Sequence, residues 1–160
     1  MLDPRITRLA TNLVNYSVAA KPGDKVLIEA TDVDTAMVTE LIKAVYAAGA
    51  YPFVETYKGK VNAALISGTS EEHSRLLAEY AKYRMERMDC YIGVRGNENA
   101  FDMSGVPDAK NEIYKRLYSY PVHHEIRVNT TRWVVLRWPN DSMAQLSGVP
   151  TDEFEKHYFD

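Results

Sequence analysis

Residues Lys25-Val26-Leu27-Ile28-Glu29 decide the fold of this 160-residue chain. Three apolar residues in a row follow the turn signal Lys21-Pro22-Gly23-Asp24, and such a run predicts a strand that is covered on both faces. Strands of this kind belong to parallel sheets, whose neighbouring strands are reached through long, usually helical crossovers. The sequence on either side of this stretch should therefore supply helices.

Helical and extended patterns alternate on both sides of this strand. Before it, Asp3-Pro4 is typical of a helix start, and apolar residues recur at helical spacing as far as Tyr16. After it, Asp34 precedes a helical stripe that stops at Gly49. The other elements that we predict are strands over 51–56, 90–94 and 132–137, a short helix over 61–66, a helix from about 69 to 88, and a helix that begins at 107–108. Residues 120–131 show no clear pattern.

This alternation predicts an α/β fold. We expect a three-layer, Rossmann-like or flavodoxin-like domain with right-handed crossovers and a mostly parallel sheet of about four or more strands. In the helix over 69–88, Thr69 and Glu72 have the spacing of a capping box. Its inward-facing residues should be Leu76, Leu77, Tyr80 and Met88.

Composition narrows the classes of function. Charged residues make up 26% of the chain and the net charge is −3, which argues against a nucleic-acid partner. No apolar stretch is long enough to span a membrane, and Asp3-Pro4-Arg5 interrupts any signal-peptide core. The single cysteine, Cys90, lies in an apolar run, so a buried, reduced thiol and a cytoplasmic location are expected.

The loop after the third predicted strand is the best candidate for a ligand contact, because parallel sheets bind ligands beyond the carboxyl ends of their strands. It contains Arg95, Asn97, Glu98 and Asn99 around the turn residue Gly96. The alternative is a solvated loop whose Asn side chains bond their own backbone. The first strand is followed by neither a Gly-x-Gly-x-x-Gly motif nor a P-loop, which argues against a dinucleotide cofactor.

No set of residues in the sequence predicts a metal site. We expect His123 and His124 on extended chain, where adjacent side chains point to opposite sides and do not converge on one ion. Glu153 and His157 share a helical face but supply two ligands at most. Ser142 fits either the cap of a short helix or a place near a substrate cleft, and it lacks the surroundings of a nucleophilic serine.

Several segments, in order along the chain, resemble the aminopeptidase T family of metal-dependent aminopeptidases. They cover essentially the whole sequence, although none is a catalytic signature. The segments are Leu13-Val-Asn-Tyr-Ser17, the run over 21–28, Ala48-Gly-Ala-Tyr-Pro-Phe-Val54, the runs over 78–89 and 91–99, Pro121-Val-His-His-Glu-Ile-Arg127, and Trp133-Val-Val-Leu-Arg-Trp-Pro-Asn-Asp-Ser-Met-Ala-Gln-Leu146.

The resemblance implies an enzyme that removes N-terminal residues from peptides as a homodimer with zinc or cobalt. The family's metal ligands lie in a C-terminal domain, so residues 1–160 correspond to the N-terminal domain and the chain alone should hold no metal and be inactive. On this interpretation Arg95, Asn97, Glu98, Asn99, Ser142 and Gln145 face substrate or the absent domain. The alternatives are a module that binds a small ligand and a protein-interaction domain.

The last residues support the expectation that the chain is truncated. Thr151 should cap a helix that places Phe154 and Tyr158 on one face, and nothing after them supplies a partner for these rings. We therefore expect the segment after Gly148 to fray or to self-associate.

Overall fold

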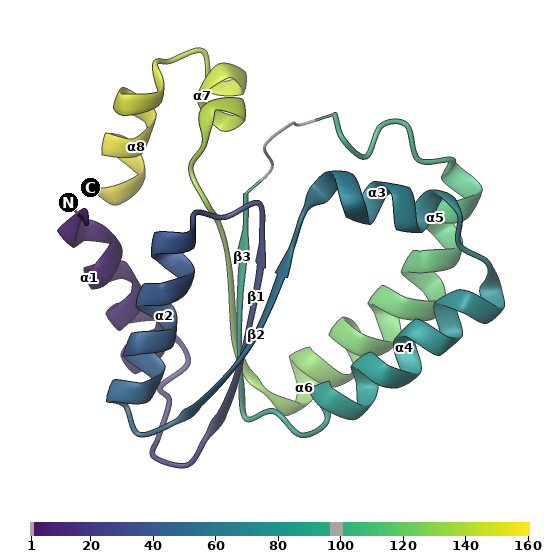
Figure 1. The fold of residues 1–160 in the computed structure, drawn as a ribbon, viewed down its shortest axis with the longest axis horizontal. Coiled ribbons are helices and arrows are strands. Elements are labelled where there is room, and N and C mark those ends of the chain that lie inside the picture. The colour runs from purple at the N-terminus through teal and green to yellow at the C-terminus, as the bar shows by residue number, and fades with distance from the viewer. Residues whose placement is uncertain (1, 97–100) are drawn as a thin grey trace.

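The structure, a computed structural model, describes residues 2–96 and 101–160 as a parallel sheet between layers of helices (Figure 1). The elements in chain order are α1 (Pro4–Asn12), η1 (Leu13–Ser17), β1 (Lys25–Thr31), α2 (Thr35–Ala47), β2 (Tyr51–Tyr57), α3 (Gly59–Ser67), α4 (Glu71–Met85), β3 (Cys90–Arg95), α5 (Asp108–Tyr114), η2 (Lys115–Arg127), α6 (Val128–Thr130), β4 (Arg132–Arg137), α7 (Asp141–Ser147) and α8 (Thr151–Phe159).

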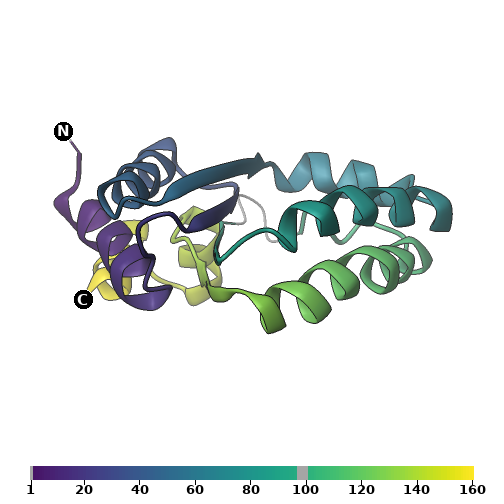
Figure 2. The ribbon, with the colours of Figure 1, turned by 90° about the horizontal axis from the view of Figure 1, so that it is seen from below.

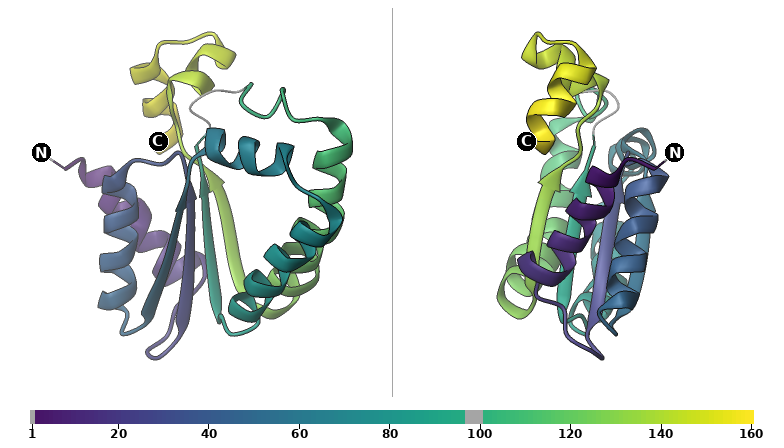
Figure 3. Two further views of the ribbon diagram at one scale, coloured as in Figure 1. Left: turned by 45° about the vertical axis from the view of Figure 1, so that its right-hand side comes forward. Right: turned by 90° about the vertical axis from the view of Figure 1, so that its left-hand side faces the viewer.

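The sheet confirms the predicted α/β fold. Its four strands are all parallel, in the order β2-β1-β3-β4. The register places Glu29 of β1 between Glu55 of β2 and Gly93 of β3. All carboxyl ends therefore meet at one edge, the top of the sheet in Figure 1, and α3 leads away from this edge toward α5. Helices α1 and α2 cover one face, and α4 and η2 lie on the other (Figures 1 and 3).

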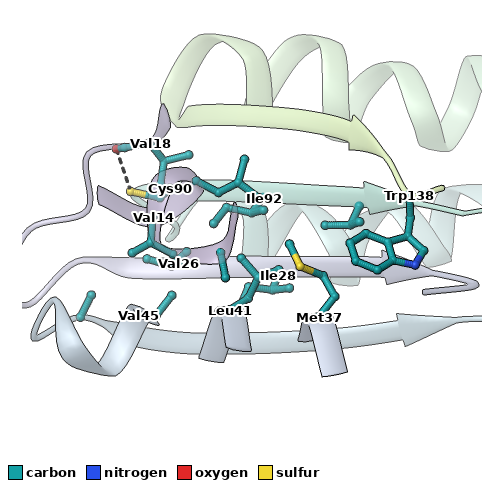
Figure 4. Packing of buried hydrophobic residues seen from close by; sticks show 14 residues of the cluster. Val14, Val18, Val26, Ile28, Met37, Leu41, Val45, Cys90, Ile92 and Trp138 are labelled. Atoms are coloured by element: carbon teal, nitrogen blue, oxygen red, sulfur yellow. Dashed lines mark hydrogen bonds between the residues drawn. The ribbon is translucent and has the colours of Figure 1, made fainter. Parts of the chain in front are cut away.

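The main core fills the face toward α1 and α2. Alternate residues of the two central strands, such as Ile28 and Ile92, are fully buried there against Leu41 and Met37 of α2 (Figure 4). Trp138, directly after β4, closes one end of this cluster. The apolar residues of β1 and β3 are consecutive because the residues between those of the main core point to the opposite face of the sheet, where a second layer of helices covers them.

The second layer is a helical pair that extends away from the sheet. Helices α4 and η2 pack side by side, and Figure 2 shows them extending away from the sheet on the side opposite α1 and α2. Only the half near the sheet's amino ends forms a core, made of Leu27, Ala78, Met85, Met88, Tyr91 and Val122. Toward the carboxyl ends the pair separates from the sheet (Figure 1), and polar side chains line that region.

The structure corrects the expectation for residues 120–131. They are helical, and Lys115–Arg127 is wound as a π-helix with Pro121 inside it. His123 and His124 therefore do not lie on extended chain, and the argument from strand alternation was wrong. A π-helix has i→i+5 hydrogen bonds, a periodicity that a search for 3.6-residue spacing does not detect.

Three predicted helix caps are shifted by one or two residues. Helix α4 is capped by Ser70, whose hydroxyl accepts from the His73 amide at 3.1 Å, whereas Thr69 is buried. Helix α7 is capped by Asn140 rather than Ser142. Thr151 is the first residue of α8, and its hydroxyl donates to Asp141 at 2.8 Å. At α4 and α7 the sequence offers two or more capping residues within a few positions, so pattern alone does not decide between them. At α8 the N-cap position is Pro150, which has no side-chain cap hydrogen bond.

Two predictions about apolar side chains were also wrong. Leu76 and Tyr80 of α4 are 48% and 78% exposed, because α4 turns Ala78 and Met85 toward the sheet instead. Of the two α8 rings that we expected to lack a partner, Tyr158 has one: its ring centroid lies 6.5 Å from that of Trp138, and its hydroxyl donates to the Arg137 carbonyl. Among the described residues, no helix combines the length and apolar character needed to cross a bilayer.

Candidate functional site

A cavity of about 420 Å³ lies at the carboxyl edge of the sheet, between the strand ends and the helices α3, α5 and η2. Its position agrees with the general rule for ligand sites in parallel α/β sheets. The residues that line it are Glu29, Thr31, Tyr57, Asn62, Tyr91, Arg95, Tyr114, Tyr118, Ser119, His123, His124 and Arg127.

The floor of the cavity is the polar face of β1 and β3. Gly93 makes room for the Tyr91 ring, because a Cβ atom on Gly93 would lie 2.9 Å from that ring. The Tyr91 hydroxyl thereby reaches the neighbouring strand and donates to Glu29 Oε2 at 3.2 Å. Register places Arg95 next to Thr31, one step closer to the edge. Strand alternation thus points a carboxylate, a phenol and a guanidinium to the same side.

Glu29 is the buried carboxylate of this floor. Burial raises its pKa above the usual range, while the Arg84 guanidinium, 3.6 Å from Glu29 Oε1, acts in the opposite direction. Arg84 also forms an ion pair with Glu55 of β2. Glu29 is therefore held by one arginine of α4 and one tyrosine of β3, as a fixed part of the wall.

The opposite wall comes from α5 and the π-helix η2. Residues five apart share a face of such a helix, which explains how Tyr118 and His123 both line the cavity, as do Tyr114, Ser119 and His124. The rings of Tyr114 and Tyr118 stack with their centroids 4.6 Å apart. Burial raises the pKa of Tyr118 to about 12, so this hydroxyl stays protonated and can both donate and accept at neutral pH.

Arg127 supplies the positive charge of this wall and is hydrogen-bonded to the neutral His123. The Arg127 Nε donates to His123 Nδ1 at 3.0 Å, so the neutral imidazole carries its proton on Nε2. Burial, followed by the charge of Arg127, lowers the pKa of His123 to about 4. The Arg127 guanidinium lies between the rings of Tyr91 and Trp133, 4.9 and 4.7 Å from their centroids.

The structure places only one of the predicted site residues at the cavity. Arg95 lines it, whereas Ser142 and Gln145 lie on α7 and do not. Asn97, Glu98 and Asn99 fall outside the described residues. Glu29, Tyr91 and Arg127 also line the cavity and were not predicted from the sequence. A charged residue that directly follows an apolar run in a strand, as Glu29 does in β1, was a usable signal, but the i, i+5 pattern of η2 was not recognised.

The described residues do not fit a divalent metal. Over 2–96 and 101–160, no group of three or more His, Cys, Asp or Glu side chains converges. Glu153 and His157 are both exposed and 4.0 Å apart, which makes a surface pair. Cys90 is buried, and burial raises its pKa to about 11, so its thiol is neither a ready ligand nor a nucleophile.

Comparisons with known proteins give one strong match. The family model described as thermophilic metalloprotease (M29) matches residues 2–160. Among solved structures, wild-type AmpT from Thermus thermophilus has a TM-score of 0.74 and 17% identity, over 98% of this chain and 42% of that one. The CurK enoyl reductase covers 96% of this chain and 47% of its own, with 13% identity and a TM-score of only 0.37. No curated protein sequence matches the chain.

Proposed function

The chain belongs to the thermophilic metalloprotease family M29, and from this we propose that it forms the substrate-facing part of a metal-dependent aminopeptidase that hydrolyses N-terminal residues from peptides. The chain spans 42% of the length of AmpT, whose fold it shares. The observation that carries the proposal is a polar cavity at the carboxyl edge of the sheet, combined with the family match.

In this proposal the described residues shape and line the peptide-binding cavity, and the metal ligands lie outside them. A divalent ion in such an enzyme polarises the scissile carbonyl and supplies a hydroxide. The side chains described here bind and orient instead. Arg95 and Arg127 attract negative charge, the tyrosines offer neutral hydrogen bonds, and Glu29 holds the Tyr91 hydroxyl in place.

The proposed enzyme is a cytoplasmic homo-oligomer. A free cysteine is compatible with a reducing compartment. Support for assembly comes from large apolar side chains that are exposed on the edge strand β2 and the neighbouring helices: Tyr51, Phe53, Val54, Val61, Leu65, Leu76, Tyr80 and Tyr83. Light scattering of the chain as a function of concentration tests this part of the proposal, and a strictly monomeric chain at high concentration would count against it.

An assay of the 160-residue chain tests whether substrate binding and metal-dependent catalysis are carried out by different parts of the enzyme. Leucyl-p-nitroanilide is incubated with the purified chain and added Co²⁺ or Zn²⁺, and each fraction of a final gel-filtration step is measured. We expect no turnover in the fractions that contain the chain. Turnover that follows the chain through the column, and that disappears with a chelator, would show that its own residues carry out the reaction.

A further inference from the structure

We propose that the cavity beside β1 and β3 is a subsite for the free terminal carboxylate of a short peptide. The inference rests on the proposed function and adds a substrate class, peptides short enough for the carboxyl end to reach Arg127 and Arg95. Its basis is a buried guanidinium that is incompletely satisfied and lines a cavity of tyrosines, one carboxylate and a second arginine.

Arg127 is the central observation. Its side chain is buried, with 7% of the residue exposed, and it lines the cavity. Nε donates to His123, but the buried NH1 atom has no hydrogen-bond partner within the described part of the chain. An arginine keeps its charge in proteins, and a buried charge without a partner is costly. A buried polar atom of this kind needs an explanation, and an anion from outside supplies one.

The cavity's own carboxylate meets this need only in part, because Glu29 acts on Arg127 through its charge and forms its direct contacts with other residues. Glu29 Oε2 accepts from Tyr91, and Glu29 Oε1 faces Arg84. Within the described ranges, no carboxylate comes within ion-pair distance of Arg127. His123 cannot compensate either, because it is neutral and already accepts from Arg127. Arg95 adds a second positive charge to the cavity, so two guanidinium groups line it against the one carboxylate of Glu29, and this balance favours an incoming anion.

The shape and lining favour a peptide carboxylate. A volume of about 420 Å³ accommodates an amino-acid residue and is within the usual size of small-molecule sites. Guanidinium groups pair well with planar carboxylates. Tyr57, Tyr114 and Tyr118 add aromatic surface and hydroxyl groups, which suit the side chain and amide of a terminal residue. Inorganic phosphate shares the anionic chemistry but would leave this aromatic surface unused.

Binding can be measured without any hydrolysis. The isotope-labelled 160-residue chain is titrated with N-acetyl-leucine, with N-acetyl-leucine amide and with inorganic phosphate, while amide chemical shifts are recorded. The acetyl group removes the free amino terminus that an aminopeptidase needs, so the result does not depend on metal or activity. We expect N-acetyl-leucine to shift signals of η2 and β3, and the amide to bind roughly tenfold more weakly or worse, since it lacks the charge-assisted hydrogen bonds.

Two variants and a matched control locate the site. Arg127→Lys keeps the charge and removes the planar guanidinium, and Arg95→Gln removes an exposed charge at the cavity. Arg137→Gln is the control, because Arg137 is the register partner of Arg95 on β4 but does not line the cavity. We expect both test variants to weaken N-acetyl-leucine binding roughly tenfold and the control to leave it unchanged. Thermal melts monitored by circular dichroism verify that each variant is folded.

Several results would overturn the inference. These are equal binding of acid and amide, acid binding that neither Arg127→Lys nor Arg95→Gln weakens, and phosphate binding in the absence of N-acetyl-leucine binding. Any of them would remove the subsite and leave the family assignment intact. Conversely, failure of the aminopeptidase proposal in its own assay would not alter a positive titration here.

Discussion

At the scale of single residues, two hydrogen bonds made by glycine amides fix the strand ends at which the cavity begins. Asp32 follows β1 with a left-handed φ of 51°, and its carboxylate accepts from the Gly59 amide at 3.1 Å, at the start of α3. Gly96 follows β3, and its amide donates to Thr31 at 2.8 Å. These contacts fix the ends of β1 and β3 against each other, and with them the positions of Thr31 and Arg95.

Replacing Gly96 by alanine should therefore be costly. The new Cβ atom would lie 2.3 Å from the Asp32 carbonyl oxygen, a backbone atom that cannot rotate away. We expect a loss of about 2 kcal/mol in the free energy of unfolding, measured by urea denaturation. Gly105→Ala is the matched control, since nothing lies within 4 Å of its added Cβ. Equal stability of the two variants would contradict the close approach.

His123 should make stability depend on pH. Its pKa is about 4 in the folded chain against an ordinary 6.5, so below pH 6.5 the unfolded chain takes up a proton that the folded chain refuses. The contribution of neutral His123 to the free energy of unfolding is therefore complete above pH 6.5, and it is lost as the pH falls toward 4. Relative to His123→Gln, the wild type should lose about 1 kcal/mol per pH unit in this window.

The comparison with His123→Gln isolates this group. The raised pKa of Glu29 has the opposite sign, since its burial favours the folded state more as the carboxyl becomes protonated, and it is present in both proteins. Glutamine keeps an acceptor for Arg127 Nε but does not titrate. Denaturation curves at pH 7, 6 and 5 provide the measurement. A constant difference between the two proteins would show that His123 is protonated equally in both states.

At the scale of elements, the strands were predictable and one helix was not. All four strands agree with the sequence prediction to within about two residues, because continuous apolar runs bounded by turns have few alternative interpretations. Helix η2 was missed because Pro121 and an i, i+5 spacing hide its pattern. The cavity was therefore not predicted from the sequence, because His123 and Arg127 lie on that helix and contact Tyr91, which is distant in sequence.

Helix α8 should be a docked element rather than a frayed end. Phe159 packs against the main core, beside Trp138 and under the Arg5 guanidinium at 4.8 Å, and the Tyr158 hydroxyl donates to the Arg137 carbonyl. We expect Phe159→Ala to destabilise the fold by about 2 kcal/mol in urea denaturation.

Leu146→Ala is the control for α8, because Leu146 of the neighbouring α7 is 68% exposed and should contribute little. Amide hydrogen exchange gives an independent check, with protection of residues 154–159 expected in a monomeric sample. Fast exchange there, together with no effect of Phe159→Ala, would restore the expectation of fraying.

At the scale of the whole molecule, one face of the sheet carries the main core and the other carries the cavity. One face carries the main apolar core under α1 and α2. The other is apolar only near the amino ends of the strands and becomes a charged, tyrosine-lined cavity toward the carboxyl ends. The sequence predicts the layered fold, because local periodicity records burial. It does not predict strand order or the cavity, because both depend on how distant segments pack.

The central claim of the proposed function is that this chain contributes binding surface and that the metal is held by residues outside the described ranges; the family assignment supports it. The most direct measurement is the zinc content of the purified 160-residue chain, by mass spectrometry after equilibration with zinc and exhaustive dialysis. The account predicts far less than one zinc ion per chain. One tightly held zinc ion per folded chain, lost when His or acidic residues of the chain are replaced, would contradict it.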